Sequence, residues 1–264
     1  GGICLVGASP YIADCIIQNC SSDSSGGFGA GIALIEDSNV VLVNTIIQSN
    51  TGNGYSYGGG LYCSQSRAVL AGCEIRNNTR STSGNLTGGG IYAEGSDSDI
   101  ELLNCLIADN NAQSGAGIYT NSKTVRYEND IDLGQIAIAC QLRLNNCTAA
   151  NNVGDGIFSV KSNTFINNSI IWGNTGHNVW VDDLVYTGII LYSDVQGLNN
   201  GTDNKFSGQN NKSVDPNFSP IAGDYHLKSH VGRFNPVTET WVIDEVNSPF
   251  IDNGAETDSV GPEP

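Results

Sequence analysis

The sequence predicts an all-β protein, a solenoid of parallel strands with about 7–9 coils and a loop-rich C-terminal segment. Two observations predict this fold class. A pair of short sequence blocks recurs along the chain, and the stretches around them are short, β-branched and separated by Gly, Asn and Ser. A unit of about 22–32 residues with two or three strands of about 3–5 residues fits one coil, which buries its inward residues by stacking on its neighbours.

Both blocks appear six times. The first opens on Gly and continues with apolar residues, and it begins at Gly2, Gly31, Gly60, Gly90, Gly117 and Gly156. The second opens on a small residue and begins at Cys15, Thr45, Cys73, Cys105, Cys147 and Ser169. Successive second blocks start 30, 28, 32, 42 and 22 residues apart. Another short apolar piece, such as 40–43 or 100–103, lies between the blocks, so we expect up to three strands in each coil.

Stacked coils place equivalent residues in columns about 4.8 Å apart. The small residues that open the second block suit a tight interior column. The residue five positions later is Asn in five of the six units, namely Asn50, Asn78, Asn110, Asn152 and Asn174. We expect their side-chain amides to hydrogen-bond along the stack, as an asparagine ladder that also satisfies the turn between strands.

The segments between one unit and the next vary in length, which is typical of surface loops, and the longest unit contains an insertion over 121–135. The repeat stops at about Asp215, and prolines become frequent after it. The last coil of a solenoid presents unpaired strand edges that need covering. We therefore expect coils over 1–214 and a C-terminal cap with a linker tail over 215–264.

The Gly-Gly-Gly-Ile-Tyr unit at 88–92 and the Cys-x-Ile-x-Asn-Asn unit at 73–78 resemble those of right-handed parallel β-helix proteins of the pectate-lyase-like superfamily. Segments 215–218, 223–227 and 248–254 look like the terminal motif of large secreted bacterial β-helix repeat proteins. The resemblance covers essentially the whole chain. It implies a right-handed parallel β-helix, an extracellular or cell-surface location and, for an enzyme of this type, acidic polysaccharide substrates.

Charge excludes several partners. The chain has 11 Lys+Arg against 27 Asp+Glu, which gives a formal net charge of −16. Nucleic acids and anionic membrane surfaces bind clustered basic residues, so we expect neither as a partner. The sequence has no apolar run of roughly 18–20 residues, so we expect no membrane insertion. The same charge would repel a polyuronate, which is the substrate that the resemblance implies.

Catalysis remains the alternative interpretation, as a polysaccharide lyase or a glycoside hydrolase. A glycosidase needs two carboxylates about 5–10 Å apart. Asp182 and Asp183, near His177 and Trp180, are the nearest approach to such a group. No catalytic motif of the superfamily maps onto them, so we assign no catalytic residue.

A calcium site is the one metal site that the sequence indicates. Glu128, Asp130 and Asp132 alternate within the insertion, and clustered carboxylates suit Ca²⁺ as a hard cation. A solvated acidic face is the alternative. We expect no other cofactor, because there is no Cys-x-x-Cys or His-rich spacing for zinc.

The eight cysteines allow two interpretations. Four of them open the second block, where a buried free thiol behaves as a small hydrophobic side chain. An exported chain also permits disulfides, and the candidate pairs are Cys73 with Cys105, Cys4 with Cys15, and Cys63 with Cys73. We favour buried free thiols.

An aromatic column follows the first block at Tyr62, Tyr92 and Tyr119, and Phe158 continues it. If Ile91 points inward, Tyr92 points outward, because side chains alternate along a strand. Such a row is a candidate platform for neutral sugars. The alternative, which we favour, is a ladder that stabilises the stack or packs under a loop.

The sequence has no Met and opens at Gly1 within a coil, so we expect a processed form or a piece of a longer protein. Were Gly1 the mature end, the exposed first coil would allow end-to-end pairing with another copy. We therefore expect a non-catalytic extracellular module with a structural or adhesive role. Its expected partners are other copies of itself or a neutral glycan.

Overall fold

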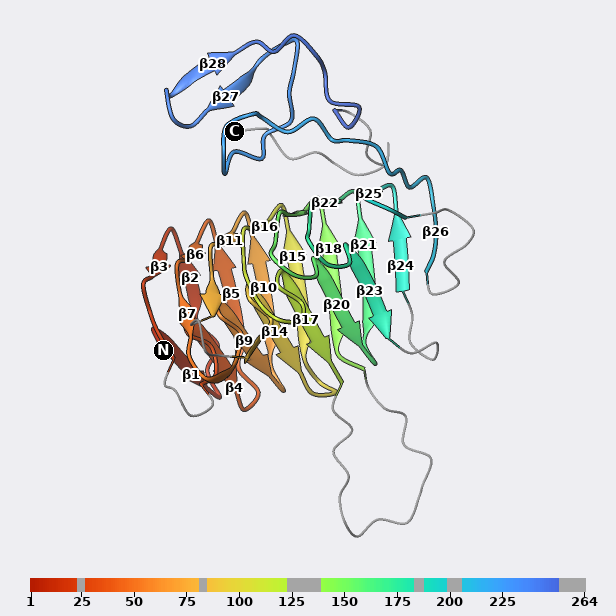
Figure 1. Ribbon diagram of the computed structural model, residues 1–264. Coiled ribbons are helices and arrows are strands. Elements are labelled where there is room, and N and C mark those ends of the chain that lie inside the picture. The colour runs from red at the N-terminus through yellow and green to blue at the C-terminus, as the bar shows by residue number, and fades with distance from the viewer. Residues whose placement is uncertain (23–26, 81–84, 123–138, 183–187, 199–205, 252–264) are drawn as a thin grey trace.

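The computed structural model describes residues 1–22, 27–80, 85–122, 139–182, 188–198 and 206–251 (Figure 1). Every regular element within these ranges is a β-strand. The described residues include no helix that is long and apolar enough to cross a membrane. Three long parallel sheets organise the molecule, and each coil contributes one strand to each sheet in turn.

The first sheet has seven strands: β1 (Ile3–Val6), β4 (Ile32–Ile35), β9 (Leu61–Ser64), β14 (Ile91–Glu94), β17 (Ile118–Asn121), β20 (Ile157–Val160) and β23 (Val179–Asp182). The second has eight: β2 (Tyr11–Ala13), β5 (Asn39–Val43), β10 (Arg67–Ala71), β15 (Asp99–Leu103), β18 (Gln141–Asn145), β21 (Asn163–Asn167), β24 (Gly188–Leu191) and β26 (Ser207–Gln209). The third has seven: β3 (Ile16–Gln18), β6 (Ile46–Gln48), β11 (Glu74–Arg76), β16 (Leu106–Ala108), β19 (Thr148–Ala150), β22 (Ile170–Trp172) and β25 (Asp194–Val195). The described chain thus forms a parallel β-helix of seven coils and one strand of an eighth, as predicted.

Short parallel pairs extend two of the loops. β7 (Thr51–Gly52) pairs with β12 (Thr79–Arg80), and β8 (Tyr55–Tyr57) pairs with β13 (Asn85–Thr87). Successive loops therefore stack on one another beside the coils, which carries the parallel pairing beyond the three main sheets.

Coil-to-coil register explains why the columns exist. In the second sheet, Val69 pairs with Val41 on one side and Glu101 on the other, without a shift. Inward positions alternate with outward ones, so each column keeps one direction. The inward columns are buried and mostly aliphatic: Ile32, Leu61, Ile91, Ile118 and Ile157 from the first sheet, Leu42, Leu70, Leu102 and Leu144 from the second, and Ile47, Ile75, Ile107 and Ile171 from the third. Burying each such side chain contributes about 1.5–3 kcal/mol.

The turn from the second to the third sheet has one left-handed residue in every coil. These residues are Asp14, Asn44, Gly72, Asn104, Asn146, Asn168 and Tyr192, with φ between 46° and 61°. The left-handed region costs most L-residues about 1–2 kcal/mol, whereas Gly, Asn and Asp enter it routinely. This column, which the repeat pattern alone does not reveal, accounts for part of the high Asn content.

The C-terminal segment differs from the predicted end cap. Its described part, residues 215–251, runs back along the turns and the outward face of the third sheet, and we call residues 212–251 the strap (Figure 1). The Tyr225 hydroxyl donates a hydrogen bond to Asp109 Oδ1 at 2.7 Å, three coils before the end. The exposed strand β26 lies at the end of the second sheet, and the strap leads away from it. The described part of the predicted cap is therefore a lateral cover.

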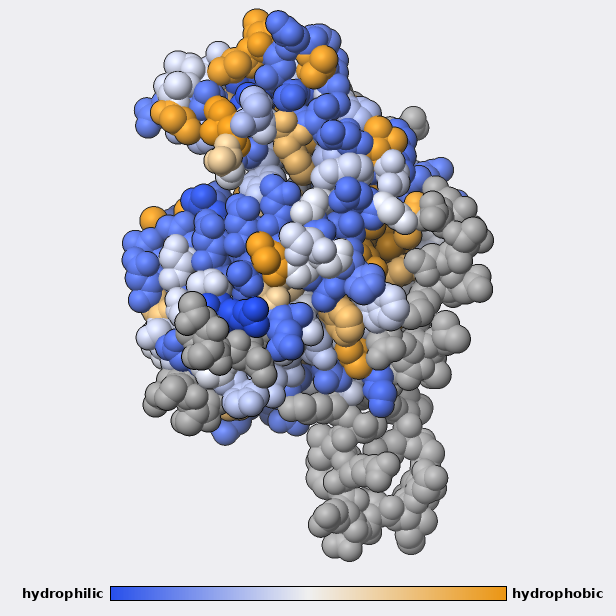
Figure 2. Space-filling model, in the orientation of Figure 1, coloured by the Kyte–Doolittle hydropathy of each residue, from blue (hydrophilic) through white to orange (hydrophobic). Residues whose placement is uncertain are grey.

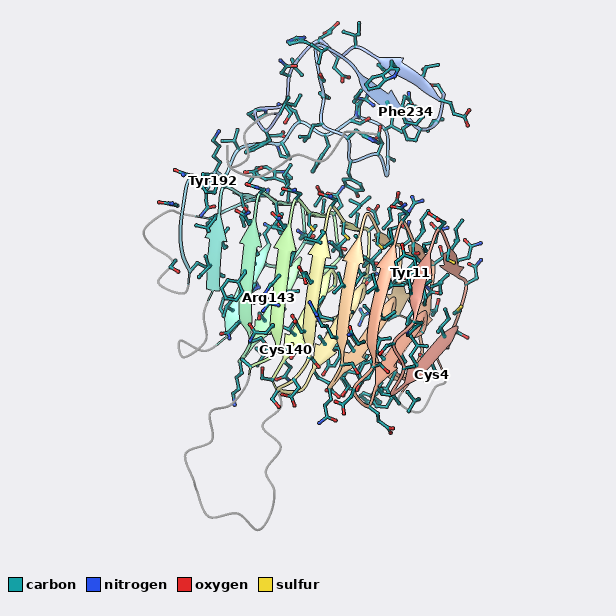
Figure 3. All side chains as sticks on the ribbon, turned by 180° about the vertical axis from the view of Figure 1, so that it is seen from behind. Cys4, Tyr11, Cys140, Arg143, Tyr192 and Phe234 are labelled. Atoms are coloured by element: carbon teal, nitrogen blue, oxygen red, sulfur yellow. The ribbon has the colours of Figure 1, made fainter. Side chains whose placement is uncertain are left out.

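An antiparallel hairpin forms the outer part of the strap, with β27 (Arg233–Asn235) and β28 (Thr240–Val242). Arg233 is buried and anchors the hairpin: its Nη1 donates to Asp224 Oδ2 at 3.0 Å and its Nε to Asp244 Oδ2 at 2.9 Å. Phe234 and Trp241 pair across the opposite face and are exposed, which places apolar surface on the outside of the hairpin (Figures 2 and 3).

Candidate functional site

The five ladder asparagines form one continuous hydrogen-bonded stack. The Nδ2 of each donates to the Oδ1 of the next, at 2.9 Å from Asn50 to Asn78, 3.0 Å from Asn78 to Asn110, 3.0 Å from Asn110 to Asn152 and 2.8 Å from Asn152 to Asn174. All five are buried. These bonds fit the asparagine ladder that the spacing predicts.

Each internal amide of the ladder has further partners. Asn110 Nδ2 also donates to the carbonyl of Ile75 at 2.9 Å, and its Oδ1 accepts the backbone N–H of Asn78 at 3.0 Å. The same pattern holds one coil earlier, where Asn78 Nδ2 donates to Ile47. Because both donors and the acceptor are used, these amides hold the register of the coils and have little capacity left for a ligand.

The aromatic side chains also form a continuous column outside the main core. The ring centroids lie 5.7 Å apart from Tyr62 to Tyr92, 5.2 Å from Tyr92 to Tyr119 and 5.5 Å from Tyr119 to Phe158, with the planes within 6° of parallel. Trp180 continues the stack at 6.3 Å from Phe158. The ring faces therefore cover one another along the column.

Burial divides this column into two parts. Tyr62 is 4% exposed and Tyr92 is 2% exposed, and the rings of Phe28 and Tyr57 lie against them. Their hydroxyls donate to the two oxygens of buried Glu94, at 2.7 and 2.9 Å. Burial is the main cause that raises the pKa of both tyrosines, and the Glu94 hydrogen bonds add to it. A sugar platform needs rings that solvent can reach, so at the buried Tyr62 and Tyr92 the structure corrects the expected carbohydrate site.

The other end of the column is more accessible. Tyr119, Phe158 and Trp180 are only partly buried. His177 lies beside Trp180, with 4.6 Å between ring centroids, and its Nδ1 is 3.0 Å from Asp155 Oδ1. The sequence indicates His177 and Trp180 as neighbours but not Asp155, which stands 22 residues before His177 and lies one coil away.

The structure tests neither of the predicted acidic sites. Glu128, Asp130 and Asp132 lie outside the described residues, as does Asp183, so the calcium and carboxylate-pair expectations stay predictions. Within the described ranges, no group of three or more His, Cys, Asp or Glu residues is arranged to hold a metal ion. On the second sheet, Arg67 pairs with both Asp99 and Glu101, and Arg143 also contacts Asp99.

All eight cysteines are free thiols. Cys73, Cys105 and Cys147 stack in the predicted small column and are buried, as are Cys63 and Cys140, whereas the three cysteines of the first coil are more accessible. Burial raises the pKa of the Cys140 thiol to about 12. A thiol of this kind packs as a small apolar group and is a poor nucleophile.

A groove separates the strap from the third sheet, with a volume of about 580 Å³. Glu74, Arg76 and Thr148 line it from the coils, and Tyr225 and His226 line it from the strap. Arg76 Nε lies 2.9 Å from Glu74 Oε2, so the two charges on the coil side largely cancel. This groove could not be predicted from the sequence, which indicates a C-terminal segment at the end of the solenoid and not beside it.

Comparison with known proteins identifies the fold family. The sequence of residues 1–200 matches the family described as the right handed beta helix region. No curated protein and no solved structure gives a significant match. The stacked parallel sheets agree with the family match, which covers more than half of the chain. The chain therefore belongs to the right-handed β-helix family.

Proposed function

We propose that this chain is a non-catalytic, extracellular module with a structural and adhesive role. The observation that supports it most is that the polar and charged groups of the coils bind one another. Each of the three central ladder amides makes its bonds within the protein, and the charged groups of the second sheet pair with one another. Groups engaged in this way stabilise a rigid, repeating body.

The adhesive contact belongs, in this proposal, to the accessible end of the aromatic column. Tyr119, Phe158 and Trp180 are partly exposed in succession along the axis. Apolar ring edges in a row suit an extended polymer that lies along the column. The net charge of −16 favours a neutral glycan over an acidic one.

A panel of neutral and acidic polysaccharides tests the proposal. We expect binding of a neutral polymer, without unsaturated products and without new reducing ends. Trp180→Ala should weaken that binding at least several-fold. Trp172→Ala is the matched control, because Trp172 is also partly buried but lies on the third sheet.

Release of defined oligosaccharides would overturn the non-catalytic proposal and favour the lyase or glycoside hydrolase alternative. In that case Asp155→Asn is the first variant to assay, because Asp155 is the carboxylate that contacts His177 beside Trp180. Equal binding by the Trp180 and Trp172 variants would contradict the assignment of the glycan to the aromatic column.

A further inference from the structure

Asp194 occupies an unusual place on the third sheet. It opens β25 and pairs with Ile170 of β22, so its side chain lies in the outward column of this sheet. Earlier members of the column, such as Leu106 and Thr148, are partly exposed. Asp194 is only 1% exposed. The outward column is therefore covered at this position, and the cover is the strap.

The cavity around Asp194 is small and partly apolar. It has a volume of about 200 Å³, and Leu227 and Phe250 of the strap line it opposite Asp194 and Ile170. Asp194 Oδ1 accepts the backbone N–H of Val214 at 3.1 Å. Its Oδ2 is buried and has no hydrogen-bond partner among the described residues. Such a site accepts a neutral carboxylic acid far better than a carboxylate.

The charged neighbours do not compensate a carboxylate at this position. Lys212 is near enough to lower the pKa of Asp194, but its ammonium group stands over the Phe250 ring, 5.6 Å from the centroid. Asp215 has the opposite effect, and the titratable Tyr192 and Cys147 line the same cavity. Burial is the largest influence and raises the pKa of Asp194 to about 7.

We propose that Asp194 is a pH-operated latch, which fastens the strap across the third sheet when its carboxyl group is protonated and releases it when the group ionises. Release would uncover the outward face of the third sheet and open the 580 Å³ groove beside it. Leu227 and Phe250 supply the moving side of the latch, and Asp194 and Ile170 the fixed side.

The direction of the effect follows from linkage. A released Asp194 ionises near its ordinary pKa of 3.8, whereas the covered group stays neutral up to about pH 7. The contribution of Asp194 to strap closure is therefore fully present below about pH 4. It decreases as the pH rises and reaches its minimum above about pH 7. Between pH 5 and pH 8.5 the opening equilibrium should rise by up to about a hundredfold.

Hydrogen–deuterium exchange of the whole chain tests the latch. Exchange is followed by mass spectrometry at pH 5 and pH 8.5, with times scaled for the intrinsic pH dependence of exchange. We expect strap peptides around Leu227 and Phe250 to exchange up to about a hundredfold faster at the higher pH. Peptides from β9 and β10, which belong to the other two sheets, should keep the same protection at both pH values.

Two variants separate the latch from general pH effects. Asp194→Asn keeps the size of the side chain and cannot ionise, so its strap should remain protected at both pH values. Asp97→Asn is the matched control, since Asp97 is exposed and lies between β14 and β15, away from the strap, and it should keep the wild-type response. Equal strap protection at both pH values in the wild type, or a full pH response in Asp194→Asn, would overturn the proposal.

A direct titration keeps the test independent of variant stability. The carboxyl carbon of Asp194 is followed by NMR in the wild-type chain. A midpoint near pH 7 supports the latch, and a midpoint near the ordinary value of 3.8 contradicts it.

Discussion

The coils and the strap are held together in different ways. In the coils, every strand of the three main sheets pairs with its equivalents, and the Asn and aromatic columns repeat the same contact from coil to coil. The strap has one short hairpin and depends on individual contacts, such as Arg233 with Asp224 and Asp244. Repetition distributes stability over many equivalent contacts, whereas the strap concentrates it in a few charged and polar groups that a single change can remove.

Asn110→Ala should have the largest effect, because it breaks the middle of the ladder. The change removes both Nδ2 bonds and leaves the amide of Asn78 without its acceptor. With at least two buried groups unpaired, we expect a loss of about 3–5 kcal/mol in the free energy of unfolding, measured by urea denaturation. Asn39→Ala is the control: Asn39 is exposed, and we expect a change within about 0.5 kcal/mol. A loss below about 1 kcal/mol for Asn110→Ala would show that the ladder contributes little.

Arg233→Met should act on the strap and spare the coils. It removes the guanidinium group that pairs with Asp224 and Asp244 in a largely buried site. We expect this to lower the free energy of strap opening by about 3 kcal/mol. We expect limited proteolysis to cut the strap faster while the thermal transition of the coils, followed by circular dichroism, stays in place.

Arg67→Met provides the matched control, because Arg67 pairs with Asp99 and Glu101 on an exposed face. We expect it to change the free energy of unfolding by less than about 1 kcal/mol. If the coils of Arg233→Met also unfolded at a lower temperature, the result would contradict our claim that the two regions are stabilised independently.

Asn104→Val tests the smallest of the three effects, the left-handed turn column. Asn104 is exposed and has φ of 52°, so a β-branched side chain there should cost about 1–2 kcal/mol of stability. Asn104→Gly enters the same conformation without strain and should stay within about 0.5 kcal/mol of the wild type. Equal stability of the two variants in urea would show that the turn does not select its residue.

Repetition also decides how much could be predicted from the sequence. The small column and the asparagine ladder are visible because each position recurs at nearly constant spacing, and a tight parallel stack admits few other residues there. The left-handed column recurs just as regularly, but its members alternate among Asn, Asp, Gly and Tyr, which share a backbone conformation and not a side-chain type.

The contacts that could not be predicted from the sequence are those that occur once. Glu94 takes both tyrosine hydroxyls, and Asp155 meets His177 across one coil, yet neither has an equivalent in other coils that would mark it. The path of the strap is also a single event, since Tyr225 reaches Asp109 over a separation of 116 residues. Periodicity carries no information about such contacts, which depend on the complete tertiary arrangement.

Hydrogen exchange of the wild-type chain at one neutral pH tests the central contrast most directly. The backbone N–H groups of Asn78, Asn110 and Asn152 donate to the next ladder side chain, so their exchange reports on the ladder itself. We predict that these amides exchange only by global unfolding and are among the slowest in the chain, whereas strap amides exchange at least a hundredfold faster through local opening. Equal protection of ladder and strap amides would contradict the account.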